Sequence, residues 1–187
     1  KLIESFCNQY VGFVRVVAED GSLGWGQLST YNSDITQQIL HRQVAPWVLG
    51  CDVSTPEMLG DTLDLVTEKE HKFPGSYLRR AMAGVDTAIW DLYGRQQDKP
   101  VAALLGGSAG KVRAYASSMK RDITPQDEAK RMCALRDKYG FDAFKVRAGA
   151  EVGRNRDEWP GRTEEIIPTM RQAMGDNASL LIDANSC

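Results

Sequence analysis

The sequence predicts an α+β domain that is followed by the first part of an α/β domain with parallel strands. A strand hairpin opens the chain, and the patterns that follow it up to residue 108 are helical, so no strand lies between those helices to build a parallel sheet. From residue 109 onward strand and helix patterns alternate, which is typical of parallel strands joined by right-handed crossovers. We therefore place two domains at residues 1–108 and 109–187.

The first domain begins with a pattern of aromatic and β-branched residues from Tyr10 to Val17, followed by a turn-forming stretch and Leu23–Gly26. This pattern predicts an antiparallel hairpin. Apolar residues at helical spacing then predict one helix that follows a Ser33 cap and closes at Gly50, and a second helix that begins near Pro56.

A third helix is predicted over residues 76–97 and ends before Lys99-Pro100, because apolar residues recur there at spacings of three and four. The residues that share this face are Leu78, Ala81, Met82, Val85, Ala88, Ile89 and Leu92.

The second domain is predicted to contain three strands and two helices. The strands are expected at 112–118, 141–147 and 179–183, and the helices at 125–139 and 159–174. A closed (β/α)8 barrel needs eight strand–helix units in about 250 residues. The barrel is therefore expected to be incomplete, and the sequence to be a truncated part of a longer protein.

Composition limits the classes of partner and compartment. Lys and Arg number 23 against 25 Asp and Glu, so the chain has no cationic surplus with which to bind nucleic acid. No apolar run approaches the about 20 residues that cross a bilayer, and the first residues lack the apolar stretch of a signal peptide. We expect a cytoplasmic protein that binds no membrane, with Cys7, Cys51, Cys133 and Cys187 as free thiols.

Candidate site residues lie at the carboxyl ends of two predicted strands. Alternate strand residues face the same side, so Lys145 points with Arg147 and Asp183 points with Asn185. Ligands and catalytic groups gather at this end of barrels and open α/β sheets. From the pattern alone, an ordinary ion pair is the favoured explanation of either cation, and Asp183 is equally explained by a cap on the following turn.

Several motifs resemble those of the mandelate racemase and muconate lactonizing enzymes of the enolase superfamily. Gly75–Ala81, its continuation Gly84–Leu92 and Leu104–Gly107 closely resemble the hinge helix of that family. Gly24–Gln27 is similar to the end of the family's N-terminal hairpin. The matches span nearly the whole chain in the family's order.

The resemblance extends to the predicted barrel strands. Phe144–Arg147 resembles the family's Lys-x-Lys motif on the second strand, and Ile182–Ser186 resembles the third-strand motif that bears the first metal ligand. The resemblance implies an α+β capping domain followed by the first part of a (β/α)8 TIM-type barrel. Loops near Leu28–Asp34 and Gly50–Ser54 would close on the substrate.

The same resemblance implies the roles of individual residues. Asp183 would be one of three carboxylate ligands to Mg2+, which stabilises the enolate formed when the proton α to a substrate carboxylate is removed. Lys145 would help to offset the developing charge. Asn185 would be a nearby substrate contact, and Tyr31 lies in a polar loop that could hydrogen-bond substrate hydroxyls.

Arg147 departs from the family pattern, because a lysine at this position often serves as the base. A guanidinium rarely gives up its proton near neutral pH, so Arg147 is expected to orient or stabilise the substrate while the base comes from elsewhere. His41 and His71 lie in the capping domain outside any matching motif and are expected to be helix-surface residues.

These observations together predict a Mg2+-dependent lyase that dehydrates a hexonate, pentonate or aldarate to its 2-keto-3-deoxy acid. A racemase, epimerase or cycloisomerase is the alternative within the same chemistry. A non-catalytic homologue or binding module is the alternative from another class, and two more strand-end carboxylates with a later His or Lys would argue against it. The expected partners are a small-molecule carboxylate and further copies of the chain in a homo-oligomer.

Overall fold

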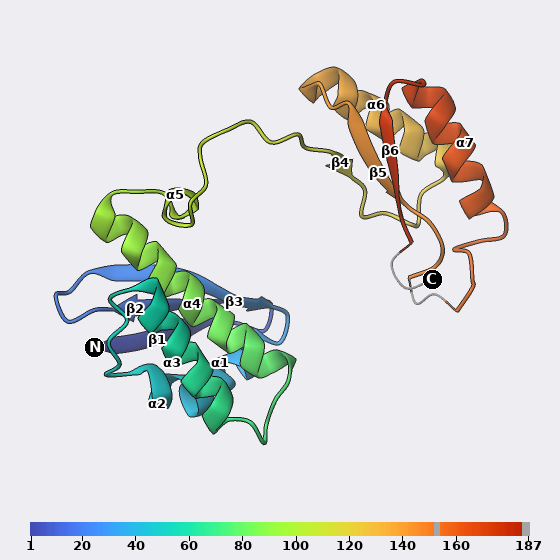
Figure 1. Ribbon diagram of the computed structural model, residues 1–187. Helices are drawn as coiled ribbons and strands as arrows, with labels where there is room; N and C mark the ends of the chain where they lie inside the picture. The colour runs from blue at the N-terminus through green and yellow to red at the C-terminus, as the bar shows by residue number, and fades with distance from the viewer. Residues whose placement is uncertain (152–153, 185–187) are drawn as a thin grey trace. The chain divides into compact units, whose positions relative to one another are not determined.

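The computed structural model describes residues 1–151 and 154–184 (Figure 1). The chain divides into two compact units, Lys1–Ala109 and Gly110–Cys187. The first is an α+β capping domain, and the second is the beginning of a (β/α)8 barrel that is incomplete in this chain. Among the described residues, no helix is both long and apolar enough to cross a membrane.

The capping domain contains a three-stranded antiparallel sheet with strand order β1-β2-β3. The predicted hairpin is confirmed as β2 (Val11–Val17) and β3 (Leu23–Thr30), and an additional strand, β1 (Leu2–Cys7), pairs with β2. Strand β1 was not predicted, and its residues include the polar Glu4 and Ser5.

The two faces of this sheet differ as strand alternation requires. Val14, Val16 and Leu28 are buried against the helices, whereas Phe13 and Trp25 lie on the opposite, more exposed face.

The helix expected between Ser33 and Gly50 consists of three segments: α1 (Ser33–Ile39), a π-helical turn η1 (Leu40–Val44) and α2 (Ala45–Val48). One cause of the interruption is Pro46, which has no amide N–H to continue the helical ladder. The prediction of Ser33 as the cap is wrong. The cap position belongs to Asn32, and the buried Ser33 hydroxyl donates to the Ser29 carbonyl.

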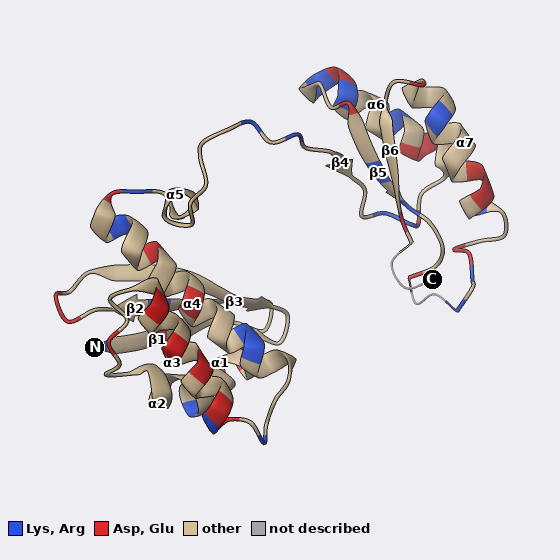
Figure 2. Ribbon diagram, in the orientation of Figure 1, with Lys and Arg blue, Asp and Glu red and all other residues tan. Residues whose placement is uncertain are grey.

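Helix α3 (Pro56–Lys69) begins as predicted, with Thr55 as its cap. The Thr55 Oγ1 accepts from the amide of Met58 at 3.3 Å. Leu59 and Val66 are buried, and acidic residues recur along the exposed face of the helix (Figure 2). Helix α3 is therefore amphipathic, with its apolar stripe toward the capping-domain core.

Helix α4 (Ser76–Gln97) has the predicted bounds and packs against the sheet (Figure 1). Gly24 and Gly26 of β3 allow the close approach: a Cβ on Gly26 would lie 2.0 Å from the Gly84 carbonyl oxygen of α4. Asp91 of α4 accepts the Trp25 amide at 2.8 Å, which adds a polar tie between helix and strand. A short helix, α5 (Val101–Leu104), follows.

The second unit has three parallel strands in the order β4-β5-β6. Its elements are β4 (Ala116–Ser117), α6 (Pro125–Tyr139), β5 (Ala143–Arg147), α7 (Arg162–Met174) and β6 (Ser179–Asp183). The prediction of a strand over 112–118 is correct only at Ala116–Ser117. Val112 is 90% exposed, so this apolar residue does not belong to a buried strand.

The two faces of β5 have different environments. Phe144 and Val146 are buried in a core that also contains Met132 of α6 and Ile166 of α7. Alternation directs Lys145 and its odd-numbered neighbours to the face away from this core. A set of polar side chains is thereby collected on the sheet face that the two helices do not cover.

Candidate active site

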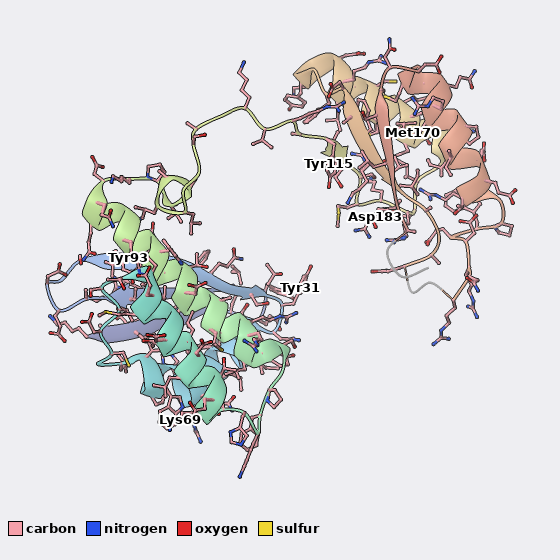
Figure 3. All side chains as sticks on the ribbon, viewed as in Figure 1. Tyr31, Lys69, Tyr93, Tyr115, Met170 and Asp183 are labelled. Atoms are coloured by element: carbon pink, nitrogen blue, oxygen red, sulfur yellow. The ribbon has the colours of Figure 1, made fainter. Side chains whose placement is uncertain are left out.

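The strand register brings three of the predicted site residues together. Arg147 of β5 pairs directly with Asp183 of β6, and Lys145 lies two residues earlier on the same face of β5. The Lys145 Nζ lies 3.1 Å from Asp183 Oδ2, and the Arg147 Nε lies 3.9 Å from the same oxygen. Asp183 stands at the carboxyl end of its strand (Figure 3).

Lys145 is held in its charged form by its neighbours. The hydrogen bond to Asp183 and the charge of that carboxylate raise the pKa of the Lys145 ammonium, and Tyr115 acts in the same direction. The Nζ also lies 5.5 Å from the centroid of the Tyr115 ring, within cation–π distance. Lys145 is therefore a cation near neutral pH, suited to stabilise negative charge and unsuited to accept a proton.

Arg147 retains unused hydrogen-bonding capacity. Its Nη2 contacts the Met119 sulfur at 3.4 Å, a weak acceptor, and its buried Nε has no hydrogen-bond partner within the described part of the chain. The Nε is buried beside Asp183, and a guanidinium can bind a carboxylate through two parallel hydrogen bonds from its other N–H groups. Its geometry therefore supports binding or orientation of an anionic group.

The donor chemistry of this site fits a hard cation in part. Asp183 supplies a carboxylate oxygen, the ligand type that Mg2+ binds through one or two protein carboxylates together with water or substrate oxygens. Within residues 1–151 and 154–184, no group of three or more His, Cys, Asp or Glu residues could hold a metal ion. Asp183 can thus supply one ligand, and further ligands would come from other parts of the protein.

Tyr31 lies at a strained turn of the capping domain. Tyr31 and Asn32 have φ values of 60° and 53°, in the left-handed region that non-glycine residues rarely adopt and that often marks functional sites. The Tyr31 ring makes an edge contact with Tyr10 at 6.3 Å between centroids, and the Asn32 Nδ2 donates to the Tyr77 hydroxyl at 3.1 Å. Tyr31 is 68% exposed, so its hydroxyl is accessible to a ligand.

The expectation that residues 50–54 close on the same substrate as residues 28–34 is wrong. The Tyr93 hydroxyl binds the carbonyls of Val53 and Thr55, whereas Tyr77 contacts the Tyr31–Asn32 turn. Tyr77 and Tyr93 are about 24 Å apart along α4 at about 1.5 Å per residue. Figure 3 shows Tyr31 and Tyr93 at opposite ends of the capping domain, so one small molecule cannot touch both loops.

The remaining predicted residues are surface residues or lie outside the described residues. His41 and His71 are exposed, and their ring nitrogens pair with Ser5 Oγ at 2.7 Å and the Glu68 carbonyl at 2.8 Å. Asn185 lies outside the described residues. Cys7, Cys51 and Cys133 are free thiols, as expected.

Sequence reasoning missed Tyr115 as a neighbour of Lys145. Strand alternation contained the signal, because Tyr115 and Ser117 share a side and Ser117 pairs with Lys145.

The fold is that of an enolase-superfamily barrel protein with its N-terminal cap. A profile of the mandelate racemase / muconate lactonizing enzyme N-terminal domain matches residues 3–106. The chain therefore belongs to the mandelate racemase / muconate lactonizing enzyme family.

Two relatives of the chain are named for different reactions, a dehydration and a cycloisomerisation. The chain is 32% identical to an arabinonate dehydratase from Saccharolobus solfataricus over 185 residues, which cover 92% of this chain and 44% of the relative. It is 30% identical to a D-galactarolactone cycloisomerase from Agrobacterium fabrum, covering 92% of this chain and 43% of the relative. The chain thus spans less than half the length of these relatives.

Solved structures share the fold over nearly the whole chain. A protein from Roseobacter denitrificans, provisionally named a racemase, is 73% identical with a TM-score of 0.94, covering 99% of this chain and 50% of that protein. A mandelate racemase/muconate lactonizing protein from Paracoccus denitrificans, complexed with magnesium, is 26% identical with a TM-score of 0.80, covering 94% of this chain and 47% of that protein.

Proposed function

We propose that the full-length protein removes the proton α to the carboxylate of a sugar acid and then eliminates the β-hydroxyl. The proton passes to a base, the hydroxyl leaves as water after protonation, and the resulting enol rearranges to a 2-keto-3-deoxy acid. The observation that carries this proposal is the group of Lys145, Arg147 and Asp183 on the helix-free face of the sheet. The group joins two cations to one carboxylate at a strand end.

Lys145 has the role of electrostatic stabiliser. Removal of an α-proton places negative charge on the substrate carboxylate, and a fixed ammonium lowers the free energy of that charged state. The hydrogen bond to Asp183 raises the pKa of Lys145 and so favours its charged form.

Arg147 has the role of orienting the substrate, through a planar donor fork that matches a carboxylate. A base for the α-proton then comes from another part of the protein.

Asp183 is the residue of this chain that would hold Mg2+. When bound, the cation supplies positive charge that offsets the charge developing on the substrate carboxylate. The Lys145 Nζ and the Arg147 Nε lie 3.1 and 3.9 Å from the same oxygen of Asp183. Tyr31 and Asn185 are proposed as substrate contacts, Tyr31 because its strained, exposed turn carries a free aromatic hydroxyl.

Dehydration is favoured over racemisation because Arg147 replaces a residue that could serve as a second base. Two-base racemisation needs a proton acceptor on each face of the α-carbon, and a guanidinium does not accept a proton near neutral pH. The name of the arabinonate dehydratase relative is consistent with this choice. A cycloisomerase is the second candidate, supported by the similarly distant D-galactarolactone cycloisomerase.

The test is a panel of hexonates, pentonates, aldarates and an aldarolactone incubated with the full-length protein and Mg2+ in deuterated water. The expected result is keto-acid formation with deuterium at C3 of the product, the carbon that takes a proton from solvent when the enol becomes the ketone. Exchange or epimer formation without keto acid would replace the dehydratase with a racemase or epimerase, and lactone-ring opening would identify a cycloisomerase. Neither signal with any acid would support a non-catalytic homologue.

A further inference from the structure

The main chain at the end of β5 and directly after it makes hydrogen bonds to several neighbouring elements. Residues 147–150 form hydrogen bonds with the loop before α6, with the start of α7 and the segment that leads to it, and with β6. The contacts are Arg162 Nη1 to the Arg147 carbonyl (2.9 Å), Arg121 Nε to the Gly149 carbonyl (3.2 Å), the Gly149 amide to Thr163 Oγ1 (2.9 Å), the Ala148 amide to the Asp183 carbonyl (3.1 Å) and the Ala150 amide to the Arg156 carbonyl (2.9 Å).

Arg162 is an unexpected residue at its position. It is the first residue of α7, where the helix dipole disfavours a cation, and its side chain is completely buried. A buried guanidinium is costly unless it is paired, yet this side chain donates to two neutral carbonyls, those of Arg147 and Ile123. The Asp157 carboxylate is close enough for its charge to interact with the guanidinium. The Arg162 Nη2 has no hydrogen-bond partner in the part of the chain that the structure describes.

The contacts of Arg162 connect two segments of the main chain. Its Nε bond to Ile123 at 3.1 Å reaches the loop that leads from β4 to α6, and its Nη1 bond reaches the end of β5. The Trp159 ring lies 5.3 Å from the guanidinium carbon and covers it. Arg162 therefore joins the end of β5 to the loop between β4 and α6 through main-chain atoms.

Thr163 holds the Gly149 amide through a hydroxyl that is itself hydrogen-bonded to Asp157. Its hydroxyl accepts from the Gly149 amide at 2.9 Å and donates to Asp157 Oδ1 at 2.6 Å. Asp157 in turn accepts the Thr163 amide at 2.7 Å through Oδ2. The hydroxyl orientation is thus set by a carboxylate, which leaves its lone pair directed at Gly149.

We infer that Arg162 and Thr163 are positioning residues that hold the end of β5, and with it Lys145 and Arg147, in the geometry needed for the reaction. This inference rests on the proposed function. Arg147 is bound directly through its carbonyl, and Lys145 lies two residues earlier on the same strand. Displacements of about 1 Å in such a site can reduce rates about 100-fold, so main-chain fixation affects turnover without any contact to substrate.

The experiment uses the full-length enzyme with four substitutions. Thr163→Val removes the hydroxyl at nearly constant volume, Thr163→Ser restores it, and Arg162→Lys retains the charge but cannot reach both carbonyls. Thr169→Val, on the same helix, is the matched control. Each variant is assayed for kcat and KM well below its unfolding temperature, and hydrogen–deuterium exchange is measured by mass spectrometry on a peptide that contains residues 147–150.

The expected result is at least a ten-fold loss of kcat in Thr163→Val and Arg162→Lys, faster exchange in the peptide, recovery of most of the kcat in Thr163→Ser, and wild-type behaviour in Thr169→Val. Faster exchange with unchanged kcat would overturn the positioning role while leaving the proposed function in place. Unchanged exchange in Thr163→Val would show that the Thr163 hydroxyl does not hold the main chain of residues 147–150. A wild-type enzyme with neither keto-acid formation nor α-exchange would refute the proposed function, and the positioning role with it.

Discussion

Substitution of Gly26 by alanine tests the close packing of β3 on α4. A Cβ at this position would lie 2.0 Å from the Gly84 carbonyl oxygen and 2.9 Å from the Ala88 amide nitrogen. Ordinary carbon–oxygen contacts are about 3.3 Å, so helix and strand must separate by about 1.3 Å. Both clashing groups belong to the main chain, and no side-chain rotation relieves the overlap.

The expected loss of stability lies at the upper end for overpacked cores, about 3 kcal/mol. Gly26 is absent from the residues with positive φ, so alanine is allowed by the backbone and the loss measures the clash. Gly60 provides the control: it lies within α3 with no atom within 4 Å of an added Cβ. Gly60→Ala is expected to stabilise by up to about 1 kcal/mol, as alanine usually does in a helix.

The assay is urea unfolding of the full-length protein followed by tryptophan fluorescence, which is sensitive to the capping domain because Trp25, Trp47 and Trp90 belong to it. With a slope of about 2 kcal/mol per molar urea, Gly26→Ala should lower the midpoint of the capping-domain transition by about 1.5 M. A midpoint within about 0.2 M of the wild type would show that β3 and α4 are not in the close contact described.

Three further predictions concern the site and the loops. Asp183→Asn in the full-length protein should weaken Mg2+ binding and abolish turnover while the protein remains folded; unchanged binding in calorimetry would remove Asp183 from the metal site. Arg147→Lys keeps the charge but loses the planar fork, so KM for the sugar acid should rise at an unchanged unfolding temperature, and an unchanged KM would contradict the orienting role. Tyr93→Phe removes a hydroxyl that binds two carbonyls of residues 53–55, and should destabilise the protein by about 1–3 kcal/mol at pH 7. Burial raises the pKa of Tyr93 to about 12, so the stabilisation should be complete below pH 10 and decline toward pH 12; a stability difference from Phe that does not change over this range would refute the assignment.

The elements that were predicted with correct bounds are those whose own residues carry the full signal. Helix α4 has an apolar stripe over its whole length, and β6 ends where an apolar run meets Asp183. Strand β4 was overestimated because Val112 and Tyr115 have strand propensity but no partner strand at their positions. Propensity alone does not decide pairing, which depends on neighbours distant in sequence.

The candidate site was predictable to the extent that strand alternation determines it. Counting along the strands placed Lys145 with Arg147 and Asp183 with Asn185 at the carboxyl ends of two strands, and the register shows that Lys145, Arg147 and Asp183 meet. The role of Arg162 was not predictable, because a lone arginine near a helix start normally indicates a solvated surface. Its burial depends on the path of the chain through Ile123 and Arg147, which no local pattern contains.

Core residues and cationic residues alternate along β5, and this alternation affects how such a protein can change over evolutionary time. Phe144 and Val146 maintain the core, while Lys145 and Arg147 face away from it. Point substitutions at the odd positions can alter chemistry without disturbing the packing beneath. An insertion or deletion of one residue would exchange the two sets and bury both cations. Lineages that diversify this scaffold are therefore expected to vary the identity of these side chains while keeping the length of the strand constant.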